Sequence, residues 1–182
     1  KPLRSIFYDR KDIRSVKISD GIQVINDGAF MECENLQSID VPPSVVEIGW
    51  QAFINCYRLK SIVIPPGVQR IGYLAFSGCH DLTTVGIPPS VTYIGERAFS
   101  YCAHLASIVI PEGVEWIGTY TFSGCSNLTS VIIPEGLTRI GFEAFSGCKN
   151  LKTLVIPQSV KEILWNAFQG CDDLVVHSPK GS

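Results

Sequence analysis

The chain has 182 residues, 46% hydrophobic and 18% charged, with a formal net charge of -2. This is enough for one domain with a continuous core, and the absence of a basic block argues against nucleic-acid binding. No apolar run approaches the roughly 20 residues that a membrane-spanning helix needs. Because Lys1 opens the chain without a Met or a secretion signal, we expect a longer or processed parent protein.

Three residue types recur along the chain at a constant spacing of 23 residues. A fixed period of this length indicates stacked coils, in which each position lies over the same position of the next coil. Seven units fill residues 13–173 without insertion or deletion. The recurring residues are Cys33, Cys56, Cys79, Cys102, Cys125, Cys148 and Cys171; Phe30, Phe53, Phe76, Phe99, Phe122, Phe145 and Phe168; and Ile25, Ile48, Ile71, Ile94, Ile117, Ile140 and Ile163.

The first residues, 1–12, match the back half of an additional coil. Phe7 lies 23 residues before Phe30, Ile6 falls in the slot that alanine fills elsewhere, and Arg10 takes the cysteine slot. A charged residue there suits a solvent-facing cap, which terminal repeats need to close an open core. The whole chain is therefore expected to be one domain with an N-terminal half-repeat cap.

Each full unit opens with an expected strand, as in the third unit. Ile62 and Ile64 alternate with Ser61 and Val63, which is the period of a strand with one buried face. Pro65 lacks an N–H group and is expected to end the strand. The isoleucines should point into the core and the alternate residues to solvent.

The rest of the unit is expected to return across the opposite side of the coil. A second short extended piece runs through Val68 and Ile71, and Gly72 after it predicts a positive φ angle. Residues 75–79 are too few for a stable helix, so we predict a single helical or 3₁₀ turn that directs Phe76 inward.

The last unit departs from the pattern. Leu164 occupies the glycine slot, which predicts a different turn there. Residues 174–182 begin a new repeat at Leu174 that is one residue short and stops near Pro179. We expect this partial repeat to cover the C-terminal end of the core.

The recurring Ile-Pro, Val, Ile-Gly, Ala-Phe and Cys of unit 59–81 resemble the BspA-like, or treponemal-type, leucine-rich repeats, over residues 13–173. The resemblance implies a leucine-rich-repeat solenoid of the α/β class, rich in β structure, with right-handed stacked coils. It also implies a cell-surface or secreted protein that adheres to host extracellular proteins or to neighbouring cells. Repeat residues in that family are scaffold, so the resemblance carries over no catalytic residue, metal ligand or cofactor.

The cysteines allow a metal, a disulfide or a structural interpretation. A 23-residue ladder is unlike the clustered spacing of metal ligands, and parallel stacked side chains make disulfide geometry awkward. We expect a column of buried free thiols that act as small hydrophobes. His80, His104 and His177 stand in no arrangement with a nucleophile and are expected to be solvated.

The variable positions of the repeat supply the candidate binding residues, because stacking does not explain what occupies them. Aromatic residues lie just before or after the glycine slot and outside the core slots. They form a candidate protein-binding face, whose alternative explanation is that the rings only cover the thin back of the solenoid. The candidate residues are Trp50, Tyr73, Tyr93, Trp116, Tyr120, Phe142 and Trp165.

The outward positions of the first strand offer a rival surface. Val63, Val109, Ile132 and Val155 form an apolar strip beside a column of serine and threonine. β-Branched residues also suit strands for their own sake, so the strip has an equally simple structural explanation.

Three functions remain open at this point. The first is an extracellular adhesion module for a host or neighbouring-cell protein, and the second is a solenoid that associates with itself as a homo-oligomer. The third is an intracellular scaffold, in which free thiols would be stable. An enzyme is disfavoured, because the sequence contains neither a nucleophile–base pair nor a phosphate-binding loop.

Overall fold

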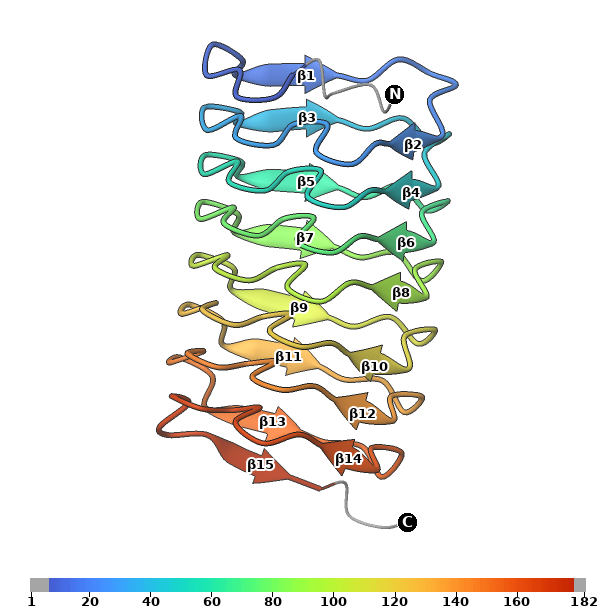
Figure 1. Ribbon diagram of the computed structural model, residues 1–182. Helices are drawn as coiled ribbons and strands as arrows, with labels where there is room; N and C mark the ends of the chain where they lie inside the picture. Colours follow the sequence, from blue (N-terminus) through green and yellow to red (C-terminus); the bar gives the residue numbers. More distant parts are fainter. Residues whose placement is uncertain (1–6, 179–182) are drawn as a thin grey trace.

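The computed structural model describes residues 7–178, which form a stack of coils made only of short strands and turns (Figure 1). The chain winds from one end of the stack to the other, and each coil contributes one strand to each of two columns. The predicted solenoid is therefore confirmed. Ile6 and the residues from Pro179 onward lie outside the described part of the chain.

The odd-numbered strands form the first column. They are β1 (Ser15–Lys17), β3 (Ser38–Asp40), β5 (Ser61–Val63), β7 (Thr84–Gly86), β9 (Ser107–Val109), β11 (Ser130–Ile132), β13 (Thr153–Val155) and β15 (Val175–His177). The even-numbered strands form the second column. They are β2 (Val24–Ile25), β4 (Glu47–Ile48), β6 (Arg70–Ile71), β8 (Tyr93–Ile94), β10 (Trp116–Ile117), β12 (Arg139–Ile140) and β14 (Glu162–Ile163).

Strand pairing follows the repeat. Where neighbouring strands pair, they are parallel and offset by one unit, so that Ser61 lies beside Thr84 in the first column. That column consists of the pairs β1–β3, β5–β7, β9–β11 and β13–β15. The final pair joins Thr153 to Val175, which is one residue less than a unit and agrees with the shortened last repeat. Parallel pairing between equivalent positions puts identical side chains on top of one another along the stack.

A single apolar core runs between the two columns. Ile62 of β5 and Ile71 of β6 are both buried, whereas Ser61 and Val63 are exposed, as the alternation predicted. The recurring phenylalanines form one column of stacked rings from Phe7 to Phe168, with neighbouring centroids 5.2 to 5.7 Å apart. This continuous column explains why phenylalanine is kept in every coil.

The prediction of a helical or 3₁₀ turn after the second strand is wrong. The segment is a series of tight turns in which alternate N–H groups donate hydrogen bonds to different acceptors. The N–H groups of Ala75, Ser77 and Cys79 donate to carbonyls three residues back, and those of Leu74, Phe76 and Gly78 donate to the next coil. Positive φ angles at Leu74 (55°) and Gly78 (75°) make this alternation possible. A helix would retain all of these donors within its own coil.

The glycine after the second strand also has a different role from the one predicted. Gly72 does not have a positive φ; instead, a Cβ at this position would lie 2.6 Å from the carbonyl carbon of Gly49. The glycine is needed because adjacent coils approach here backbone to backbone. Leu164 in the same slot keeps the hydrogen bond of its N–H to Ile140, so the last unit follows the usual path.

Candidate functional site

The outward positions of strands β4 to β14 in the second column form a symmetrical series around two aromatic side chains. Tyr93 of β8 and Trp116 of β10 occupy its centre, with Arg70 beyond one and Arg139 beyond the other. The next position beyond each arginine is a glutamate. Arg70 Nε lies 3.8 Å from the carboxylate of Glu47, and Arg139 Nε lies 3.0 Å from that of Glu162. Both arginine charges are therefore compensated within the column.

The next column along the coil has aromatic residues on both sides of its middle. Its members, in order along the stack, are Asp27, Trp50, Tyr73, Glu96, Thr119, Phe142 and Trp165. The two aromatic residues at the C-terminal end pack on each other, with ring centroids of Phe142 and Trp165 4.5 Å apart. Because Glu96 and Thr119 have no rings, the aromatic column is interrupted at its middle.

The backbone ladder is interrupted at the same level. Strands β2, β4, β6 and β8 form one sheet and β10, β12 and β14 another, so β8 and β10 are not paired. At other junctions the N–H of the glycine slot donates to the preceding coil, as Gly72 does to Ile48 and Gly141 to Ile117. Within residues 7–178, the Gly118 N–H has no such partner. The second column therefore opens between the fourth and fifth coils.

One residue of the fifth coil distinguishes it from the other six units. Thr121 fills the slot that is alanine in each of them, and its side chain is almost fully buried. Its hydroxyl donates a hydrogen bond of 3.0 Å to the carbonyl of Gly118. The Glu96 side chain also lies close to Gly118, because a Cβ at Gly118 would be 3.1 Å from the Cγ of Glu96. The extra groups of Thr121 and Glu96 occupy space that backbone stacking uses at other junctions.

These features surround a hollow of about 560 Å³ on the second column. Its volume is within the range of small-ligand and side-chain pockets. Four of the seven predicted aromatic residues line it, namely Trp50, Tyr73, Tyr93 and Trp116. The remaining lining residues are Ile94, Glu96, Ile117, Gly118, Thr119, Arg139, Gly141 and Leu164.

The other three predicted aromatic residues form a separate cluster. Tyr120 packs edge-on against Phe142, at a centroid distance of 5.3 Å, and Phe142 in turn contacts Trp165. The Arg97 guanidinium lies 4.4 Å from the centre of the Tyr120 ring. Trp165 is 71% exposed, so this cluster extends the aromatic surface beyond the hollow.

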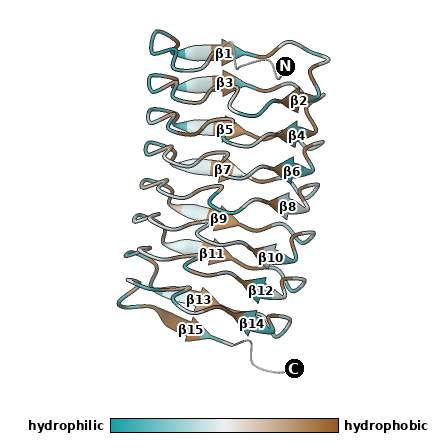
Figure 2. Cartoon of the chain, in the orientation of Figure 1, coloured by the Kyte–Doolittle hydropathy of each residue, from teal (hydrophilic) through white to brown (hydrophobic). Residues whose placement is uncertain are grey.

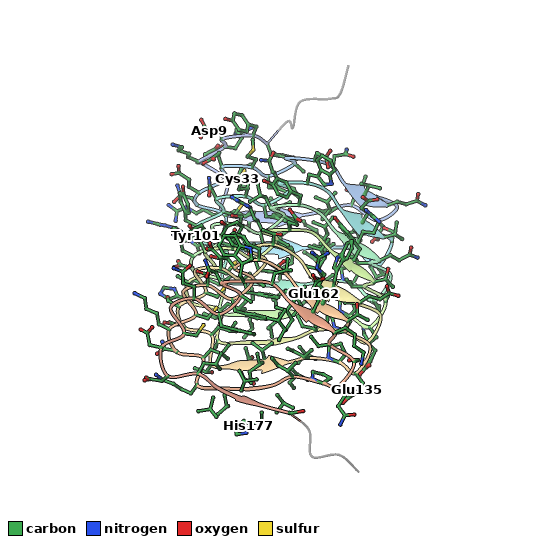
Figure 3. The ribbon with its side chains drawn as sticks, turned by 60° about the horizontal axis from the view of Figure 1, so that its bottom comes forward. Asp9, Cys33, Tyr101, Glu135, Glu162 and His177 are labelled. Atoms are coloured by element: carbon green, nitrogen blue, oxygen red, sulfur yellow. The ribbon has the colours of Figure 1, made fainter. Side chains whose placement is uncertain are left out.

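The prediction omitted two exposed aromatic residues, Tyr8 near the N-terminal end, which is 54% exposed, and Tyr101. Tyr101 is 61% exposed and lies in the turn before the cysteine, on the lateral side of the stack opposite Glu135 (Figure 3). Asp9 and His177 mark the two ends of the stack in the same view. Tyr101 occupies a variable slot of the repeat, which is the property by which it could have been recognised.

The rival surface is present on the first column. Val63 is 81% exposed, and Val109, Ile132 and Val155 are also exposed. The hydropathy colouring shows apolar residues at the ends of β9 and β13, where Val109 and Val155 lie (Figure 2). A Cβ at Gly86 would meet no atom within 4 Å, so the strip is open and has no hollow at this point.

The cysteines form the expected column of buried free thiols. Each thiol donates a hydrogen bond to the carbonyl of a phenylalanine in the preceding coil, for example Cys79 to Phe53 at 3.2 Å and Cys102 to Phe76 at 3.2 Å. Burial raises the pKa of the Cys125 thiol to about 12 and raises the pKa of Cys102 as well. Such thiols are protonated and inert at neutral pH.

Two further observations concern chemistry within residues 7–178. This part of the chain brings together no group of three or more His, Cys, Asp or Glu side chains that could hold a metal ion. It also contains no helix with the length and apolar character required to cross a bilayer.

A coiled chain with parallel strands, a stacked phenylalanine column and a fixed repeat defines a leucine-rich-repeat solenoid. The family model for the BspA-type leucine-rich repeat region matches residues 3–66 and 46–175, with six copies. The chain belongs to this family. Its fold is a scaffold of the protein-interaction kind. A search among curated proteins returned no significant match.

Solved bacterial structures agree with this assignment. A leucine-rich-repeat protein from T. pallidum is 36% identical, with a TM-score of 0.75, over 80% of this chain and 68% of that protein. One from Eubacterium ventriosum is 27% identical, with a TM-score of 0.79, over 93% of this chain and 44% of that protein. A leucine-rich cell-surface protein from Faecalibacterium prausnitzii is 30% identical, with a TM-score of 0.57, over 92% of this chain and 54% of that protein. The chain thus spans about half the length of the latter two.

Proposed function

We propose that this chain is the protein-binding module of a cell-surface or secreted protein and that it adheres to host extracellular or neighbouring-cell proteins. The observation that carries the proposal is the aromatic hollow between β8 and β10. Its two tryptophans, Trp50 and Trp116, are 59% and 47% exposed. Exposed aromatic residues around a depression are typical of the energetic centre of a protein interface.

Membership of the repeat family supports the same function. Its fold is a protein-interaction scaffold, and the F. prausnitzii relative is described as a cell-surface protein. The repeat also accounts for the buried cysteines and phenylalanines as scaffold residues. Four of the seven aromatic side chains that stacking does not explain line the hollow, where a partner could contact them.

The test is direct binding to a panel of immobilised extracellular-matrix and plasma glycoproteins. We expect saturable binding of the wild-type chain to at least one member. The double variant Tyr93→Ala/Trp116→Ala should lose about 10-fold to 100-fold in affinity, because the central aromatic residues of an interface carry most of its energy. Circular dichroism should show that the variant remains folded. Absence of binding across the panel, or full affinity in the variant, would contradict the proposal.

Self-association is the second candidate, since the same exposed rings could meet those of another copy. Light scattering over a concentration series distinguishes the two functions. The adhesion proposal predicts a constant monomer mass, whereas a homotypic role requires the mass to rise with concentration and to fall in the Tyr93→Ala/Trp116→Ala variant.

A further inference from the structure

The hollow contains one charged side chain that has no partner. Glu96 is exposed on the hollow, and its carboxylate makes neither an ion pair nor a hydrogen bond with any residue in 7–178. The nearby cations are already engaged. Arg139 pairs with Glu162, Arg70 pairs with Glu47 and covers the Tyr93 ring, and Arg97 lies over Tyr120. Arg97 does not line the hollow, so the unpaired charge on its lining is that of Glu96 and is negative.

The walls around this carboxylate are aromatic. Trp50, Tyr73, Tyr93 and Trp116 line the same hollow as Glu96. Aromatic faces attract cations through the negative potential above the ring, and tryptophan does so most strongly. The Tyr93 ring is already covered by Arg70, so a cation in this hollow would be stabilised by the carboxylate and by the other rings, such as that of Trp116.

The surface itself shows which cation suits such rings. The guanidinium of Arg70 lies 4.5 Å from the centre of the Tyr93 ring, and that of Arg97 lies 4.4 Å from the centre of the Tyr120 ring. A guanidinium can stack on a ring with its plane while its edge donates two hydrogen bonds to a carboxylate. An ammonium group cannot make both contacts in this way.

We propose that the hollow between β8 and β10 binds an arginine side chain of the partner protein, with Glu96 as the ion-pairing group and Trp116 among the stacking rings. This inference rests on the proposed protein-binding function and adds the chemistry of the partner: an arginine on an exposed segment. The alternative, an acidic partner that binds Arg70 and Arg139, is disfavoured because both already have glutamate partners.

The test uses the capped tripeptide acetyl-Gly-Arg-Gly-amide and its citrulline counterpart, which has nearly the same shape but no charge. Titration is followed by the NMR signals of the tryptophan indole N–H groups, with Trp116 assigned from a Trp116→Phe sample. We expect the arginine peptide to shift the Trp116 signal and to bind at least 10-fold more tightly than the citrulline peptide. A lysine peptide should bind more weakly than the arginine peptide.

Glu96→Gln is the decisive variant, because it removes the charge and keeps the shape of an exposed side chain. It should reduce affinity for the arginine peptide to the level of the citrulline peptide. Glu112→Gln, which removes an exposed carboxylate from a turn outside the hollow, should bind as the wild type does. Equal binding of arginine and citrulline peptides, equal binding of the lysine peptide, or unchanged affinity in Glu96→Gln would overturn the inference.

The two proposals fail in distinguishable ways. If a glycoprotein binds the wild type through Tyr93 and Trp116 but binds Glu96→Gln equally well, the arginine inference is wrong and the protein-binding function stands. If the arginine peptide binds as expected but no protein of the panel does, the hollow is a guanidinium site and the adhesion proposal is wrong.

Discussion

At the scale of single residues, the same amino acid is required for different physical reasons at different positions of the repeat. Glycine illustrates this most clearly. Gly78 has a φ of 75°, which favours a residue without a side chain, whereas Gly72 is required by the close approach of the neighbouring backbone. The sequence showed that a glycine recurs, but recurrence does not distinguish between these two reasons.

The stacking explanation predicts a large difference between two glycine substitutions. Gly72→Ala places a methyl group 2.6 Å from the Gly49 carbonyl carbon, so we expect unfolding to become easier by about 2–3 kcal/mol. Gly86→Ala is the matched control, because its Cβ meets nothing within 4 Å; its stability should change by less than about 1 kcal/mol. Urea unfolding of both variants measures the difference. Similar stability losses in both would show that the backbone contact at Gly72 is not limiting.

The buried thiols predict an unusual dependence of stability on pH. Burial raises the pKa of Cys102, so the folded protein keeps this proton above pH 9, whereas the unfolded chain releases it near pH 8.5. The free energy of unfolding should therefore fall with rising pH, by up to about 1.4 kcal/mol per pH unit for this thiol.

The Cys102→Ala variant isolates the contribution of this one thiol. At pH 7 it should be less stable than the wild type by about 1–2 kcal/mol, because it loses packing and a hydrogen bond to Phe76. Its deficit should shrink as the pH rises from 8.5 to 10. Urea unfolding of both proteins across this range gives the comparison, and a deficit that stays constant would contradict a raised pKa.

At the scale of elements, the strands are too short to be stable alone and depend on pairing with the next coil. Each even-numbered strand has only two residues, such as Arg70–Ile71 of β6. A small local change can therefore interrupt a ladder without disturbing the coil around it. The junction between β8 and β10 is such an interruption, and the phenylalanine column continues through it with Phe99 and Phe122 5.7 Å apart.

Hydrogen exchange tests this interruption. The Gly118 amide lacks the hydrogen bond that the amides of Gly72 and Gly141 make to the preceding coil. It should exchange with solvent at least about 100-fold faster than those two amides, because unbonded amides need no opening step to exchange. Residue-resolved NMR in deuterated buffer supplies the rates. Equal protection of the three amides would place β8 and β10 in a continuous ladder.

The sequence contained part of the information about this junction. Thr121 stands where the other six units have alanine, and Glu96 and Thr119 interrupt the aromatic column. These departures could have marked the level of the hollow. The lost pairing of β8 with β10 could not be predicted, because it depends on how two coils accommodate a buried hydroxyl and an overlying glutamate at distances of a few tenths of an ångström.

At the scale of the whole molecule, the repeat made the fold predictable. Cysteine, phenylalanine and isoleucine in constant slots required coils of equal length stacked in register, and the strands of both columns confirm it. The tight turns at 72–79 were mistaken for a helical turn, because sequence spacing does not show that alternate N–H groups bind the next coil. Only the three-dimensional structure shows that some of the candidate aromatic residues line the hollow and that the others form a separate cluster.

Binding through the aromatic hollow is tested most directly by comparing the two faces of the solenoid on one ligand. A glycoprotein that binds the wild type is titrated with Tyr93→Ala/Trp116→Ala and, as a matched surface variant, with Val109→Thr/Val155→Thr, which keeps β-branched residues on the first column. We expect the aromatic variant to lose about 10-fold to 100-fold in affinity and the strip variant to bind as the wild type does. Loss of affinity in the strip variant alone would contradict this expectation and would assign the binding surface to the first column of strands.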